Sequence, residues 1–206
     1  MFAPSIWHGP RHRAAIAITF DDGPSESTPA LLQLLARHRV PATFFQCGAA
    51  VERLPQIARE VSAAGHEIGN HSYSHPMLCF RSAGFLHQEL ERAQRAIERH
   101  TGAGPTLFRA PYGVRWPGLR SAQRSLGLTG VMWTVIGYDW KRAADAIVRR
   151  VSGNVSNGAI VCLHDGRALR VAPDIRNTIR ATEQLIPMLL DRGYRFETVS
   201  RLCQTT

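Results

Sequence analysis

The sequence contains no long apolar segment. Across its 206 residues, no apolar run approaches the roughly 18 residues that a transmembrane helix needs. The N-terminal segment contains Pro4, His8, Pro10 and Arg13 and lacks an apolar core, so we expect no secretory signal peptide. Repeats and low-complexity tracts are also missing. We therefore expect one domain over residues 1–206, since a domain averages about 150 residues.

Cysteine pairs at short spacing are absent. The four cysteines stand at positions 47, 79, 162 and 203, and none forms a Cys-x-x-Cys motif. In a chain of this size, scattered cysteines without a signal peptide are typical of free thiols in a reducing compartment. We therefore expect a cytoplasmic protein without disulfides. Cys162 lies in an apolar run, which predicts a small core residue.

Signatures of nucleic-acid binding are also missing, although the chain is basic. Lys and Arg number 25 against 16 Asp and Glu, a formal net charge of +9, and such a field attracts polyanions. However, the arginines are scattered along the chain, and the sequence contains no helix-turn-helix, zinc-finger or RNA-module motif. This pattern favours a generally basic solvated surface, so we expect no nucleic-acid partner.

Short apolar segments alternate with amphipathic ones along most of the chain. The apolar segments predict strands at 14–20, 42–45, 66–69, 106–108, 128–135, 159–163 and 194–198, and the amphipathic ones predict helices at 28–38, 50–64, 84–100, 117–126, 143–151 and 174–192. This alternation is typical of a parallel sheet covered by helices, and both a closed barrel and an open doubly wound sheet fit it. No phosphate-binding glycine motif follows the first strand, and polar clusters follow successive strands, as in barrel enzymes. We therefore predict an α/β fold, a distorted (β/α) barrel with about seven parallel strands.

Two of the polar clusters contain residues that can ligate a metal. The sequence TFDDGP places Asp21 and Asp22 directly after the first strand, where adjacent side chains point in opposite directions. One acid could ligate a metal while the other acts as a base, although an Asp-rich turn explains the pair as well. The sequence HSYSH supplies His71 and His75. With Asp22 they would form a two-His, one-carboxylate set suited to zinc and similar ions; the alternative is a pair of surface histidines.

Three further clusters follow the later strands. In FRAPYG, Arg109 either orients a buried carboxylate or forms a structural salt bridge. The next cluster ends in Asp139 and Trp140; Trp133 and Trp140 form either the walls of a sugar-binding groove or part of the core. In VCLHDG, His164 ends a strand and is either a catalyst or a core histidine.

In combination, these motifs resemble the polysaccharide deacetylase family, also called carbohydrate esterase family four. The resemblance spans about residues 14–196, and TFDDGP and HSYSH are its most specific parts. It implies a distorted (β/α) barrel and a metal-dependent hydrolase that removes N-acetyl groups from amino sugars and releases acetate. The expected partner is an N-acetylated oligosaccharide, polysaccharide or glycoconjugate. The expected cofactor is one divalent ion, Zn²⁺ in the first place, with Co²⁺ or Ni²⁺ as alternatives.

The resemblance also implies a role for each residue of the site. The catalytic residues are Asp21 as the base, Arg109 holding the base, His164 as the general acid and Asp139 tuning the acid. The metal ligands are Asp22, His71 and His75. The substrate-binding residues are Tyr112, whose backbone N–H is the oxyanion donor, Trp140 and Leu163.

The chain departs from the family pattern at two positions. Ile136 stands where many members carry a further Asp, which alters the polarity of the groove or the substrate range. Cys162 replaces a Leu that often forms an apolar wall facing the acetyl methyl group. Neither change removes a group that the chemistry requires. The alternatives are a metal-dependent amidase or esterase acting on a small molecule, a non-catalytic carbohydrate-binding module and a nucleic-acid-binding protein; the sequence identifies neither the glycan nor the oligomeric state.

Overall fold

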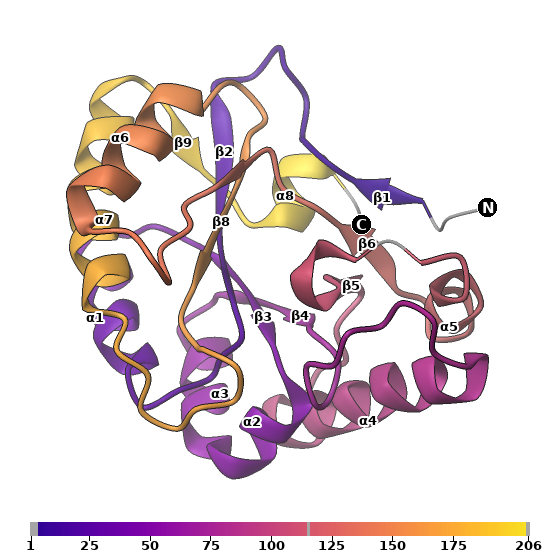
Figure 1. Cartoon of the computed structure of the whole chain (residues 1–206). Coiled ribbons are helices and arrows are strands. Elements are labelled where there is room, and N and C mark those ends of the chain that lie inside the picture. Colours follow the sequence, from indigo (N-terminus) through magenta and orange to yellow (C-terminus); the bar gives the residue numbers. More distant parts are fainter. Residues whose placement is uncertain (1–3, 115, 205–206) are drawn as a thin grey trace.

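The computed structural model describes residues 4–114 and 116–204 (Figure 1). The strands are β1 (Ser5–Ile6), β2 (Ala15–Asp21), β3 (Thr43–Gln46), β4 (Glu67–Asn70), β5 (Leu107–Phe108), β6 (Thr129–Val131), β7 (Val135–Ile136), β8 (Ile160–His164) and β9 (Arg195–Phe196). The α-helices are α1 (Thr28–His38), α2 (Gly48–Arg53), α3 (Pro55–Ala63), α4 (Ala83–Thr101), α5 (Leu119–Ser125), α6 (Ala144–Asn154), α7 (Arg176–Asp191) and α8 (Val199–Cys203). A short 3-10 helix spans Pro111–Gly113.

The strands form one parallel sheet that is strongly curled. Their order is β1-β6-β5-β4-β3-β2-β8-β7, with β9 paired to the first residues of β2. In a flat sheet, the six steps from β6 to β7 would cover about 29 Å, at about 4.8 Å per step. The chain nevertheless runs from Val131 to Val135 in four residue steps, which reach at most about 14 Å. The two edges must therefore approach each other, which confirms the predicted distorted (β/α) barrel.

The central strand β2 shows how side chains are sorted between the two faces of the sheet. Ile16, Ile18 and Phe20 point outward, into a buried apolar cluster with side chains of α1, α6 and α7. Figure 1 shows these three helices on one side of β2 and β8. Because successive strand residues point to opposite faces, Thr19 and Asp21 point into the barrel. The packing of the outer face thus determines which polar side chains point into the barrel.

Two predicted elements are each divided in the structure. The helix predicted at 50–64 consists of α2 and α3, which meet at Leu54 and Pro55. Proline lacks an N–H and disfavours helical geometry in the preceding residue, and Leu54 has φ −127° and ψ 56°. The strand predicted at 128–135 consists of β6 and β7, which lie near opposite ends of the strand order. With the short β1, which no sequence pattern predicts, the described strands number nine instead of about seven.

All four cysteines are free thiols in the structure. Cys47 and Cys162 are buried, and Cys79 and Cys203 are partly exposed. Among the helices of the described ranges, none has the length and apolarity that a membrane crossing requires.

Candidate active site

The carboxyl ends of the strands surround a pocket of about 530 Å³, within the range of about 300–1,000 Å³ that is typical of ligand sites. Asp21 ends β2, His164 ends β8 and Arg109 follows β5. Such an edge is where barrel enzymes place their catalytic side chains. The lining includes Asp21, Asp22, His71, His75, His164 and Trp140.

Three side chains with metal-ligating atoms face one another in this pocket. Oδ1 of Asp22 lies 3.2 Å from Nε2 of His71 and 2.9 Å from Nε2 of His75. Nδ1 of His71 donates a hydrogen bond to the carbonyl of Arg109 at 2.7 Å, which orients the ring and leaves Nε2 for an ion. Two imidazoles and one carboxylate form a donor set of catalytic zinc and related ions. The residues present therefore fit a divalent cation.

The electrostatics of Asp22 agree with a role as a metal ligand. Burial would raise the pKa of this carboxyl group, but hydrogen bonds and charge from His71 and His75 outweigh the burial and hold the pKa well below its usual value. Asp22 is therefore ionised at neutral pH, as a metal-binding carboxylate must be.

A buried glutamate on α4 holds the loop that carries the two histidines. Glu89 is only 6% exposed. Its Oε2 accepts hydrogen bonds from the backbone N–H groups of Tyr73 and Ser74, at 3.2 and 2.9 Å, and its Oε1 accepts one from the Ser74 hydroxyl at 2.9 Å. The sequence motifs do not identify Glu89. The sequence feature that could identify it is its position on the apolar face of α4, three residues after Leu86 and directly before Leu90. A buried acid without a partner would be costly there.

Arg109 is fully buried and holds one oxygen of Asp21. Its Nη1 donates to Oδ1 of Asp21 at 2.7 Å and to the Thr19 hydroxyl at 2.6 Å. Its Nη2 donates to the carbonyl of Met132 at 3.1 Å, and the guanidinium carbon lies 4.0 Å from the ring centroid of Phe45. These contacts fix the rigid guanidinium fork. Arg109 thus engages Oδ1 of Asp21 and leaves Oδ2 for the pocket.

His164 is held as a cation by Asp139. Nδ1 of His164 donates to Oδ1 of Asp139 at 2.9 Å, and Oδ2 of Asp139 accepts from the His164 backbone N–H at 2.9 Å and from the Thr178 hydroxyl at 2.7 Å. Burial would lower the pKa of His164, but the hydrogen bond and charge of Asp139, with the charges of Asp21 and Asp22, raise it to about 9. The ring is therefore protonated at neutral pH and can donate a proton from Nε2.

The register between β2 and β8 decides which neighbouring side chains reach the pocket. Asp21 pairs with His164 and Thr19 pairs with Cys162, so all four side chains point into the barrel. Cys162 is buried, as expected, but it lines the pocket instead of the apolar core. The prediction for Leu163 is wrong. This residue lies between two inward-facing residues and points outward, into the buried apolar cluster with side chains of α1, α6 and α7. The expected contact of Leu163 with the substrate is therefore not present in the fold.

Aromatic side chains stand at the rim and walls of the pocket. Tyr112 is 61% exposed and packs edge-on against the His75 ring, with centroids 4.8 Å apart. Trp140 is 39% exposed and packs edge-on against the His164 ring at 4.9 Å. The other walls include Trp133, Tyr138 and Ile136. The pocket thus offers ring faces of the kind on which sugars stack.

Unusual backbone conformations gather around the pocket. Positive φ angles of 73°, 62°, 55°, 60° and 53° occur at Asp22, Ser72, His75, Tyr112 and Tyr138. Such angles are uncommon in residues other than glycine and cost roughly 1–3 kcal/mol each. Residues in strained conformations cluster at functional sites, where the surrounding structure holds them in place.

Asp165 is a second buried acid that the motif analysis gives no role. Its Oδ2 accepts a hydrogen bond from the Thr28 hydroxyl at 2.7 Å, and its backbone N–H donates to the Asp21 carbonyl at 3.1 Å. Oδ1 has no hydrogen-bond partner among the described residues. Burial, together with the charges of Asp22 and Asp21, raises the pKa of Asp165 to about 7. Asp165 thus supports the turn that carries the two adjacent acids.

Comparison with known sequences gives the family. The sequence model of the polysaccharide deacetylase family matches residues 8–131. A chitooligosaccharide deacetylase of Bradyrhizobium sp. (strain ANU 289) is 39% identical over 197 residues, which cover 91% of this chain and 90% of that protein. The chain belongs to the polysaccharide deacetylase family.

Comparison with solved structures agrees with this family assignment. The Bc1960 peptidoglycan N-acetylglucosamine deacetylase superimposes with a TM-score of 0.91 at 33% identity, over 98% of this chain and 94% of that chain. A family 4 acetyl xylan esterase from Clostridium thermocellum, solved with a cobalt ion, superimposes with a TM-score of 0.83 at 32% identity, over 91% of this chain and 89% of that chain. Family and site together define a metal-dependent carbohydrate deacetylase.

Proposed function

We propose that this protein removes the N-acetyl groups of N-acetylglucosamine residues in chitooligosaccharides or peptidoglycan, releasing acetate and a free amine. The observation that carries the proposal is the convergence of three units on one pocket: the metal-ligand set, a carboxylate held by arginine, and an imidazolium held by a carboxylate. The chitooligosaccharide and peptidoglycan deacetylases among its relatives support these two substrate classes.

Asp22, His71 and His75 would hold the divalent ion, which we propose to be Zn²⁺. The chemistry of two imidazoles and one carboxylate favours zinc and other borderline cations, and the cobalt ion in a related esterase supports a site of this kind. When bound, the ion polarises the acetamide carbonyl and lowers the pKa of water.

Asp21 acts as the general base. Its Oδ2 takes a proton from the attacking water, while Arg109 keeps the carboxylate in place through Oδ1. A positioned base of this kind contributes about 10²–10⁴ in rate. The backbone N–H of Tyr112, at the rim of the same pocket, donates to the oxyanion of the tetrahedral intermediate, and such a donor is worth about 3 kcal/mol.

His164 acts as the general acid. The nitrogen of an amide is a poor leaving group, so the C–N bond breaks only when a proton reaches that nitrogen. The imidazolium of His164 supplies this proton from Nε2, because Asp139 holds Nδ1. Trp140, which packs against the same ring, provides a face for the sugar.

Acetate release from chitotetraose and from peptidoglycan tests the proposal. The wild-type protein with Zn²⁺ should release acetate from at least one of them, and His164→Ala should lose about 10²–10⁴ of the rate. The same variant should lose less on an aryl acetate ester, whose leaving group departs without protonation. Equal losses on both substrates would assign a structural role to His164. No acetate from either glycan would favour a carbohydrate-binding module or a small-molecule hydrolase.

A further inference from the structure

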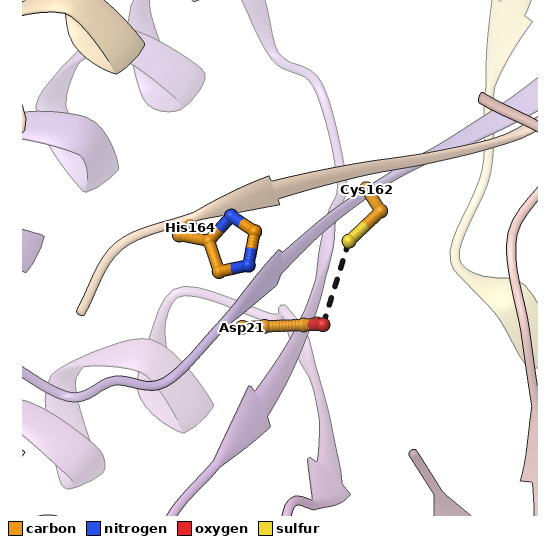
Figure 2. A group of neighbouring side chains, drawn as sticks. All are labelled: Asp21, Cys162 and His164. Carbon is orange, nitrogen blue, oxygen red and sulfur yellow. Dashed lines mark hydrogen bonds between the residues drawn. The ribbon is translucent and has the colours of Figure 1, made fainter. Parts of the chain in front are cut away.

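A second group of metal-ligating side chains lies beside the Asp22 set. A carboxylate oxygen of Asp21, the sulfur of Cys162 and a ring nitrogen of His164 all lie within 4.8 Å of one another. Figure 2 shows Asp21 on β2 and the other two side chains on β8. They meet because Asp21 pairs with His164 across the two strands, and because Cys162 precedes His164 by two residues on the same face.

Each of the three residues has a ligand atom that its contacts with residues outside this group leave available. Arg109 engages Oδ1 of Asp21, so Oδ2 remains, and Asp139 engages Nδ1 of His164, so Nε2 remains. The thiol of Cys162 donates a hydrogen bond to Oδ2 of Asp21 at 3.4 Å (Figure 2), and a bound ion would replace this contact. The existing hydrogen bonds therefore orient the remaining atoms as second-layer contacts do in metal sites.

The distance between these atoms suits a tetrahedral ion. A sulfur at about 2.3 Å and an oxygen at about 2.0 Å from a tetrahedral zinc ion lie about 3.5 Å apart, and the observed separation of Sγ and Oδ2 is 3.4 Å. Three protein ligands with a fourth position for water are a common zinc arrangement.

The donor types select a thiophilic cation. A thiolate favours Zn²⁺, Co²⁺ and related ions over Mg²⁺ or Ca²⁺, whereas the Asp22 set contains no sulfur. The buried carboxylates of Asp22 and Asp139 add negative charge around the same pocket, while Arg109 opposes it.

We propose that Asp21, Cys162 and His164 form a second, inhibitory binding site for a thiophilic divalent cation such as Zn²⁺ or Cd²⁺. Binding releases two protons to solvent, one from the thiol of Cys162 and one from Nε2 of the His164 imidazolium, and forms bonds from the ion to sulfur, oxygen and nitrogen. The ion occupies Oδ2 of Asp21 and Nε2 of His164, the two atoms that move protons in the proposed reaction. Activity should therefore rise as the first ion binds and fall as the second binds.

Cobalt titration of the metal-free protein under anaerobic conditions tests the site without turnover. The wild-type protein should bind two Co²⁺ ions, and one of them should give the near-ultraviolet charge-transfer band of a cobalt–thiolate bond. Cys162→Ser and Cys162→Ala should each bind one ion and lose the band. Cys203→Ser, which removes a partly exposed thiol on α8, should keep both ions and the band.

Zinc inhibition provides the second readout. The Zn²⁺ concentration that halves the peak deacetylase rate of each protein should be at least about tenfold higher in the Cys162 variants than in the wild type. The proposal is overturned by a wild-type protein that binds one ion without the band, by a band that persists in both Cys162 variants, or by unchanged zinc inhibition. Because stoichiometry and spectrum need no turnover, a protein inactive on the glycans would still decide whether the second site exists.

Discussion

Replacing Asp139 with Asn tests how the general acid is kept protonated. Burial lowers the pKa of His164, and Asp139 is the largest of the contributions that raise it to about 9, against an ordinary value of 6.5. Asp139→Asn keeps the shape of the side chain and removes its charge, so the pKa of His164 should fall toward its ordinary value of 6.5. At pH 8 the protonated fraction would then drop from about 90% to about 3%, a loss of about thirtyfold in the active form.

The assay is the pH profile of kcat/KM for acetate release. A group whose pKa is raised in the folded protein stays protonated until the pH rises through that raised value, so His164 sets the basic limb. That limb should move to a lower pH in Asp139→Asn than in the wild type. Both proteins are assayed with the same ion bound, so the displacement reports Asp139. Asp145→Asn, an exposed acid in the first turn of α6, is the charge-matched control. A basic limb at the same pH in Asp139→Asn and the wild type would refute the reasoning.

Three further predictions concern residues around the site. Glu89→Gln should weaken metal affinity about 10–100-fold in a chelator competition, whereas the exposed Glu98→Gln on the same helix should not; equal affinities would exclude the loop-holding role. The pKa of Asp165 is raised from 3.8 to about 7, so its contribution to stability is lost as the pH rises between these values. Asp165→Asn should therefore gain stability relative to the wild type across this range in thermal melts of metal-free protein, and a pH-independent difference would contradict it. All four cysteines should react with a thiol reagent under denaturant, as expected for a reducing compartment, whereas two or fewer would indicate a disulfide.

The local elements are predictable because their signals lie within short segments. The predicted helix at 28–38 has the bounds of α1, where Pro29 stands near the first position and Arg39 in the left-handed region ends the helix. The curl of the sheet is not local. It depends on Met132, Trp133 and Thr134 carrying the chain from β6 to β7, and a two-residue strand such as β1 carries too little periodicity to be recognised.

The site is predictable where a motif supplies the residues and less so where packing decides the outcome. The sequence predicts that Asp22 meets two histidines, and the structure brings the three together. The inward or outward direction of a strand residue depends on register, so Leu163 points away from the pocket while Cys162 faces it. Glu89 belongs to none of the motifs, and its hydrogen bonds in the structure show that it holds the loop with the two histidines.

The separate roles of the two adjacent acids are the central claim, and their conservative substitutions test it most directly. Asp21→Asn and Asp22→Asn are made in the Cys162→Ser background, so that the second proposed site cannot retain an ion. Metal content at one equivalent of Zn²⁺ and acetate release are compared with the Cys162→Ser parent. We predict that Asp21→Asn keeps its ion but loses about a hundredfold or more in rate, whereas Asp22→Asn loses the ion and recovers part of its rate with excess Zn²⁺. Loss of the ion in Asp21→Asn with retention in Asp22→Asn would contradict the account and reverse the two roles.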